Sequence, residues 1–257
     1  MPKGLRNASG TGGGAPTTSA AVRDKNGLDD PAAYNRIAQR MLDNYNVTLQ
    51  SLETVPIKTL EETMDTLAAV IDDYPMLKDS KITITGDYIA DLKNYAGTRP
   101  VYSKDGSVKN YIVLNLNNYE LNADQLSQKY SYDVKKHQFP QGTQYKHLIA
   151  HEAGHLIELR IIEKRYNTSR QRQKAWDFED VSDYILKHSY LHYVPKVQRK
   201  SYQAMRKDVS KYARQSDYGL STSETLAECI SDYAANGRAA KPLSIAVRKT
   251  LKEEFDW

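Results

Sequence analysis

Apolar residues recur at helical spacing in the first third of the chain. Between Pro56 and Pro75 the apolar positions are four, three, four and three residues apart, which places them on one face of a helix: Leu60, Met64, Leu67, Ile71 and Tyr74. An earlier helix is expected to start at Asp30-Pro31 and to run to about Leu52, because proline is favoured in the first helical turn. The pattern therefore predicts two helices before any strand.

A strand pattern follows after residue 80. Residues 81–85 alternate between apolar and polar and stop at Gly86, which is typical of a half-buried strand. The turn signal Asp105-Gly106 separates residues 100–102 from residues 111–116 and predicts two more strands. From Thr143 onward the spacing is helical almost throughout. This order predicts an α+β fold with a small sheet and a mostly helical C-terminal half.

The composition divides the chain at about residue 30. Residues 1–30 are rich in Gly, Ser, Thr, Ala and Pro, and such a segment has too little apolar surface to offset the entropy lost on ordering. We therefore expect a flexible tail over 1–30 and one folded domain over 31–257. Hydrophobic residues at 40% and charged residues at 26% suit a folded core.

Charge and hydropathy bear on whether the chain binds nucleic acid, crosses a membrane or carries a signal peptide. The net charge of +4 is too small to indicate nucleic acid by itself. Basic residues cluster within 160–174 and 196–211, where a solvated helix face is the simpler interpretation and contact with nucleic acid or an acidic partner the alternative. No apolar run approaches the roughly 18 residues of a membrane span, and no apolar stretch follows Lys3 and Arg6, so neither a membrane segment nor a standard signal peptide is expected.

The strongest chemical signal is the sequence His151-Glu152-Ala153-Gly154-His155. Residues four apart lie one turn apart on the same helix face, so both imidazoles can reach one metal ion. Glu152 is placed to take a proton from a water molecule at that ion. Apolar neighbours on both sides predict a buried helix rather than a chance match on the surface. Gly154 weakens the helix, and its small size would let another segment approach closely.

A catalytic zinc ion needs a third protein ligand and one open position. Glu158 and Ile161 stand where the short metzincin pattern requires glycine and histidine, which excludes that class. The best candidate for the third ligand is Glu224. Glu228 lies one helical turn further and can accept a hydrogen bond from a ligating histidine.

Two alternatives to this assignment remain open. Ser221-Thr222-Ser223-Glu224 also matches a capping box, in which Glu224 would bind a backbone N–H and no metal. Asp217 is a second possible ligand, as in the aspartate-type zincins, although the longer motif of that class is missing.

Taken together, HEAGH, SxYA or SxYG, and ExxAE resemble the gluzincin metallopeptidases. The resemblance covers roughly residues 57–257 and extends to the phage-encoded peptidases linked to minor head proteins and to the catalytic domain of anthrax lethal factor. It implies a zincin-like fold with an edge strand beside the cleft. It also implies one zinc ion per chain, with His151, His155 and Glu224 as its ligands. Glu152 would be the general base, and the Glu228 carboxylate would accept a hydrogen bond from a ligating histidine.

The resemblance further implies a tyrosine that donates to the oxyanion. Tyr218 in Ser216–Gly219 lies close to the usual spacing from Glu224 and is preferred, whereas Tyr212 in Ser210–Ala213 lies further upstream. With 19 tyrosines in the chain, either could be a packing residue. The segment between the two zinc motifs is long for the family, which implies a helical, basic insertion over about 156–215.

The expected function is zinc-dependent hydrolysis of peptide bonds in a protein or peptide substrate. Tyr111 to Leu116 is the candidate edge strand for pairing with an extended substrate. Two alternatives of other classes are a phage virion or scaffold-associated protein with a structural zinc ion, and a nucleic-acid-associated protein that uses the basic helices. The expected location is cytoplasmic or virion-associated.

Overall fold

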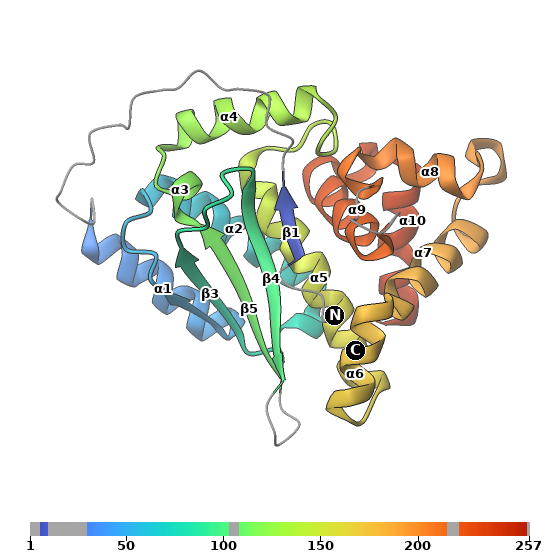
Figure 1. The fold of residues 1–257 in the computed structure, drawn as a ribbon, viewed down its shortest axis with the longest axis horizontal. Helices are drawn as coiled ribbons and strands as arrows, with labels where there is room; N and C mark the ends of the chain where they lie inside the picture. Colours follow the sequence, from blue (N-terminus) through green and yellow to red (C-terminus); the bar gives the residue numbers. More distant parts are fainter. Residues whose placement is uncertain (1–5, 10–29, 103–107, 215–220, 256–257) are drawn as a thin grey trace.

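The computed structural model describes residues 6–9, 30–102, 108–214 and 221–255. The fold is α+β, as predicted, with one sheet and a helical C-terminal half (Figure 1). The strands of the described residues are β1 (Arg6–Ser9), β2 (Val47–Gln50), β3 (Ile82–Asp87), β4 (Asn94–Tyr102) and β5 (Val108–Asn115). The helices are α1 (Pro31–Tyr45), α2 (Ile57–Asp73), α3 (Leu116–Tyr119), α4 (Ala123–Lys135), α5 (Leu148–Arg165), α6 (Ser169–Phe178), α7 (Asp180–His192), α8 (Tyr202–Val209), α9 (Thr222–Asn236) and α10 (Pro242–Glu254).

The strand order in the sheet is β1-β4-β5-β3-β2. β2, β3 and β5 are parallel neighbours, whereas β4 runs antiparallel to β5 and β1 antiparallel to β4. The prediction that 111–116 forms the edge strand is therefore wrong, because β5 lies in the interior of the sheet. β4 lies between β5 and the short outer strand β1.

The first helix is shorter than predicted. α1 ends at Tyr45, and Asn46 adopts the left-handed conformation with φ 57° and ψ 35°. Asparagine tolerates this conformation better than most residues, so it terminates the helix. Residues 47–50 then form β2, parallel to β3, where we expected the helix to continue.

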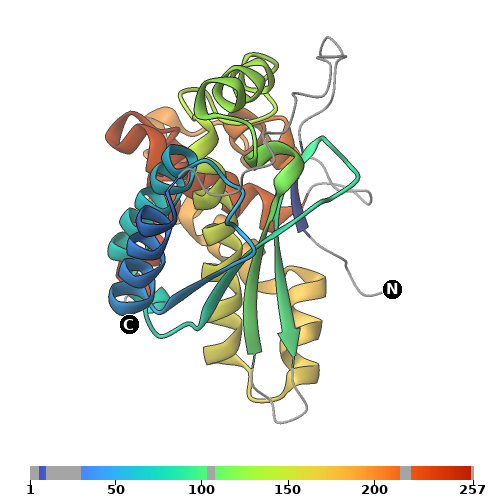
Figure 2. The same ribbon diagram turned by 90° about the vertical axis from the view of Figure 1, so that its left-hand side faces the viewer.

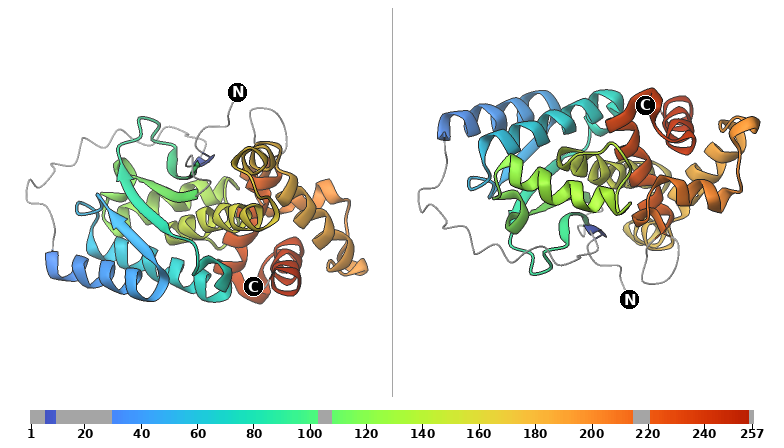
Figure 3. Two further views of the ribbon diagram at one scale, coloured as in Figure 1. Left: turned by 90° about the horizontal axis from the view of Figure 1, so that it is seen from below. Right: turned by 90° about the horizontal axis from the view of Figure 1, so that it is seen from above.

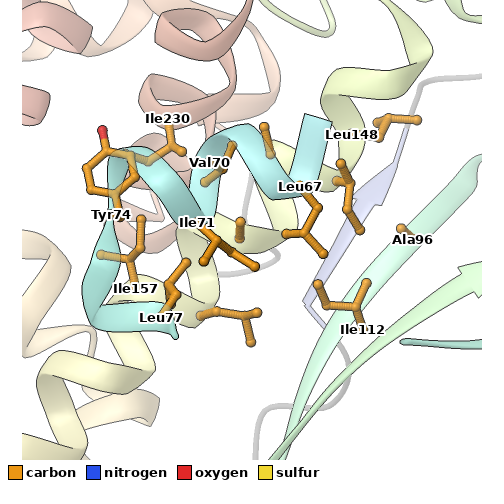
Figure 4. Packing of buried hydrophobic residues seen from close by; sticks show 14 of the residues in the cluster. Leu67, Val70, Ile71, Tyr74, Leu77, Ala96, Ile112, Leu148, Ile157 and Ile230 are labelled. Carbon is orange, nitrogen blue, oxygen red and sulfur yellow. The ribbon is translucent and has the colours of Figure 1, made fainter. Parts of the chain in front are cut away.

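The predicted stripe of α2 forms the centre of the core. Leu60, Met64, Leu67, Ile71 and Tyr74 are all buried. Figure 4 shows Leu67 and Ile71 of α2 close to Ile112 of the sheet and Ile157 of α5. α2 therefore joins the sheet to the helix that carries the HEAGH sequence.

The helices are unevenly distributed around the sheet. α1 and α2 lie side by side along one side of it, and α5 runs alongside the strands (Figures 2 and 3). The helices after α5 gather on the other side of α5, where α9 packs against α5, α7 and α10. α4 was not predicted, although Asn122 and Gln125 form a capping box at its start.

Residues 6–9 differ from the expectation of a flexible segment, because they form β1. Backbone pairing with β4 needs no apolar side chains, which is why composition could not indicate it. Among the described residues, no helix is both long enough and apolar enough to cross a membrane.

Candidate metal site

The HEAGH sequence lies in the middle of α5, which is a buried helix as predicted. Apolar residues surround it on both sides, and His151, Glu152 and His155 are each at most 1% exposed. The centroids of the His151 and His155 imidazole rings lie 5.0 Å apart. The helix therefore presents two histidines and one carboxylate inside the protein.

Gly154 lets α9 approach α5 closely. A Cβ atom at position 154 would lie 2.7 Å from Ala227 Cα and 3.2 Å from Ala227 Cβ, which are closer than normal contacts. This confirms the expectation that a small residue here admits another segment. The close approach brings Glu224, one turn before Ala227 on α9, to the two histidines.

The three predicted ligands meet at one point. Glu224 Oε2 lies 3.3 Å from His151 Nε2 and 3.6 Å from His155 Nε2. These three atoms are buried and have no hydrogen-bond partner among the described residues. Unpartnered buried polar atoms are costly, and an ion bound by all three would remove that cost. The group can hold a metal ion, and no other His, Cys, Asp or Glu group in the described part of the chain meets this geometry.

The capping-box alternative for Glu224 is half fulfilled. Ser221 is the N-cap of α9, and its Oγ accepts a hydrogen bond from Glu224 N at 3.2 Å. The Glu224 carboxylate, however, faces the histidines. Burial raises the pKa of Glu224 less than the two imidazoles lower it, so the carboxylate stays ionised beside them.

Glu228 was predicted to lie behind a ligating histidine, and the structure places it against His151. His151 Nδ1 and Glu228 Oε1 are 2.7 Å apart, and both side chains are fully buried or nearly so. Burial lowers the pKa of His151, but the carboxylates of Glu224 and Glu228 outweigh it and hold that pKa well above its usual value.

His155 has an indirect carboxylate partner that sequence reasoning missed. Its Nδ1 lies 3.1 Å from Ser223 Oγ, and the Ser223 hydroxyl donates a short hydrogen bond to Glu158. All three side chains are buried. Glu158 had been noted only as a residue that breaks the metzincin pattern. Its position one turn after Gly154 on α5 is the signal that could have identified it.

Glu152 is held by the sheet. Thr98 Oγ1 on β4 donates to Glu152 Oε2 at 2.7 Å, while Glu152 Oε1 has no recorded partner among the described residues. Burial raises the pKa of Glu152 above its ordinary value, although the two histidines and the Thr98 hydrogen bond oppose this rise. The carboxylate therefore has one fixed oxygen and one oxygen available for proton transfer.

The carboxylate of Glu179 fixes the start of α9. Glu179 accepts hydrogen bonds from Ser221 Oγ at 2.8 Å, from Thr222 N at 2.7 Å and from Thr222 Oγ1 at 2.9 Å. A negative charge at a helix N-terminus is stabilising. Glu179 thus anchors the turn that carries Ser223 and Glu224.

Only one of the two candidate tyrosines lies within the described residues. Tyr212 is buried, and its ring centroid lies 5.7 Å from that of His151. Tyr218 lies outside the described residues, and so does the alternative ligand Asp217. Of the two tyrosines, Tyr212 is therefore the one that the structure places beside the candidate metal ligands.

Several residues of the two basic segments form hydrogen bonds or ion pairs within the fold. Arg160 pairs with Glu163 at 3.1 Å, Arg172 donates to Tyr166 O at 2.8 Å, and Arg206 is buried against Thr225. These contacts favour a structural role for part of the basic segments.

Comparisons of the chain with protein-family models, with curated proteins and with solved structures find no match.

Proposed function

We propose that the protein is a zinc-dependent peptidase of the gluzincin type, with a zincin-like arrangement of helix and strand. The observation that carries this proposal is the convergence of three buried, unpartnered ligand atoms from His151, His155 and Glu224 beside the buried carboxylate of Glu152. A purely structural site would not need a further unpartnered carboxylate oxygen next to the ligands.

The donor set suits zinc. Two imidazoles and one carboxylate are a catalytic zinc set, whereas structural zinc sites use four protein ligands, mostly thiolates and imidazoles. The one cysteine, Cys229, is buried and does not belong to the group. A zinc ion held there supplies a Lewis acid that polarises a peptide carbonyl and acidifies a water molecule.

Glu152 serves as the general base in this proposal. Thr98 fixes its Oε2, so Oε1 is the atom that takes the proton from water. The same oxygen then delivers the proton to the nitrogen of the leaving amine. Burial raises the pKa of Glu152, which makes its carboxylate a stronger base for the first of these two proton transfers.

The supporting residues orient the ligands. Glu228 fixes the ring of His151, and the Ser223–Glu158 pair fixes the ring of His155. Such partners set the imidazole tautomer and increase its basicity towards a metal. Both rings thereby present Nε2 to the same point.

The variant Glu152→Gln tests the proposal, because it removes the base and keeps the ligands. We expect one zinc ion per chain and an unchanged fold, with peptide cleavage reduced about 10²–10⁴-fold. Glu163→Gln is the matched control, because Glu163 lies on the same helix and faces Arg160 instead. Undiminished turnover in Glu152→Gln would reject the mechanism, and tight zinc without any cleavage by the parent protein would favour a structural zinc ion.

A further inference from the structure

The proposed active site is closed in this structure. The four central side chains are between 0% and 6% exposed: His151, Glu152, His155 and Glu224. Because these side chains are so deeply buried, we expect a peptide to reach them only when a covering segment moves away.

β4 is the strand that serves the general base. Its Thr98 hydroxyl donates to Glu152, and β4 packs along α5. One edge of β4 is already paired with β5. An extended peptide that pairs with β4 beside Glu152 must therefore use the opposite edge.

That opposite edge is occupied by residues 6–9 of the same chain. β1 pairs with it antiparallel, with Arg6 opposite Thr98, Asn7 opposite Gly97 and Ala8 opposite Ala96. β1 also lies beside α5, as Figure 1 shows. The backbone of Arg6 is thus level with the residue that holds the general base.

We infer that residues 6–9 occupy the strand position of the substrate and block the active site in cis. This inference rests on the proposed peptidase function. It defines the substrate as an extended segment that binds antiparallel to β4 through its main chain, and it makes release of β1 a condition for turnover. The contact is only four residues long and ends in an irregularity between Ala8 and Ser9, so displacement is feasible.

A reversible cross-link tests whether β1 must leave. Directly opposed residues of an antiparallel pair have Cα atoms about 4.5–5.5 Å apart, within the range of a disulfide. We therefore choose Ala8→Cys/Ala96→Cys, since the native Cys229 is buried. With a fluorogenic peptide library as substrate, oxidation should lower cleavage at least about tenfold and reduction should restore it. Equal cleavage by the oxidised and reduced forms would overturn the inference.

A second variant releases the strand in the full-length chain. Asn7→Pro/Ala8→Pro removes two consecutive backbone donors, so one of them faces β4 whichever way the hydrogen bonds alternate. Cleavage at low substrate concentration should rise about tenfold, and amide exchange over residues 94–98 should speed up. Asn7→Ala/Ala8→Ser is the control, because it keeps both N–H groups.

The two readouts separate the possible failures. Faster exchange with unchanged, Glu152-dependent cleavage would overturn the inference and leave the peptidase function standing. Faster exchange with no cleavage in any variant would refute the peptidase function, and the blocking role with it. Unchanged exchange in the proline variant would show that β1 does not hold this edge. A synthetic peptide of residues 4–11 should inhibit the proline variant competitively and slow the exchange again.

Discussion

Thr98 on β4 donates a hydrogen bond to Glu152 Oε2 on α5 at 2.7 Å, and both side chains are buried. The bond connects the sheet to the carboxylate that we assign as the general base. Burial disfavours the ionised form of Glu152, and this hydrogen bond is one of the contacts that opposes burial. The position of β4 therefore influences the protonation of the base as well as the proposed binding of substrate.

Thr98→Val should shift the pH dependence of peptide cleavage. The substitution keeps the shape and removes the donor, so the already raised pKa of Glu152 should rise further. Because the base must be ionised to act, the acid limb of kcat/KM should move to higher pH by about one unit, the size expected for loss of one hydrogen bond to a charged group. Thr83→Val on β3 is the control. A downward shift, or no shift, would contradict the role of Thr98.

The sequence predicted the parts of the fold and site that depend on local spacing. The stripe of α2 needed only periodicity, and the strand pair over 100–102 and 111–116 needed only the turn signal between its strands. The His151–His155 pair needed only the helical repeat. The Glu224 and Glu228 spacing on α9 was equally local. What could not be predicted depends on pairing between distant segments. Thr98 and Glu152 are 54 residues apart, and no pattern in the chain indicates which strand packs beside α5.

Sheet order shows the same limit. The turn signal at 105–106 indicated the strand over 111–116, but it could not show that β4 and β1 lie outside that strand in the sheet. β1 is held by main-chain pairing with β4, and its short sequence has no apolar pattern from which a strand could be predicted. The turn from α1 into β2 was missed for another reason: Asn46 reads as an ordinary helix residue until its left-handed backbone is seen.

Ser223→Ala should weaken zinc binding without unfolding the protein. The serine links His155 Nδ1 to the buried Glu158 carboxylate, so its loss frees the imidazole ring to rotate. Loss of such partners typically costs 10–100-fold in metal affinity. Competition with a chelator would measure this change. Glu228→Gln should have an effect of similar size through His151.

Ser231→Ala is the control for that experiment. Ser231 is a buried serine of the same helix, but its hydroxyl donates to His147 O at 3.1 Å and touches no proposed ligand. An equal loss of zinc affinity in Ser231→Ala and Ser223→Ala would show that the effect is general destabilisation of α9.

Gly154→Ala should destabilise the protein, although alanine is the better helix former. Helix propensity alone predicts a gain of roughly 1 kcal/mol. The new Cβ would lie 2.7 Å from Ala227 Cα, a backbone atom that cannot move alone. Overpacking of this kind costs about 1–3 kcal/mol, so the net effect should be a loss. Urea unfolding of the metal-free protein measures it, with the exposed Lys164→Ala of the same helix as control; a gain in stability would show that α9 moves freely.

The oxyanion donor can be identified by comparing Tyr212→Phe with Tyr218→Phe. The motif spacing favoured Tyr218, whereas the structure places the ring of Tyr212 beside His151. If a tyrosine hydroxyl stabilises the oxyanion, its removal should cost about 10²–10³-fold in kcat. The hydroxyl acts in the transition state, so kcat and kcat/KM should fall together while KM and zinc content stay constant.

The two variants give opposite patterns for the two assignments. A large loss in Tyr212→Phe with none in Tyr218→Phe would assign the role to Tyr212, and the reverse would assign it to Tyr218. A packing role for Tyr212 can be tested separately, because its ring also packs against Phe139, with the two ring centroids 6.1 Å apart. Tyr212→Phe keeps that ring, whereas Tyr212→Leu removes it and should lower the unfolding midpoint further. A fall in kcat for Tyr212→Phe at unchanged stability therefore separates the hydroxyl's chemistry from the ring's packing.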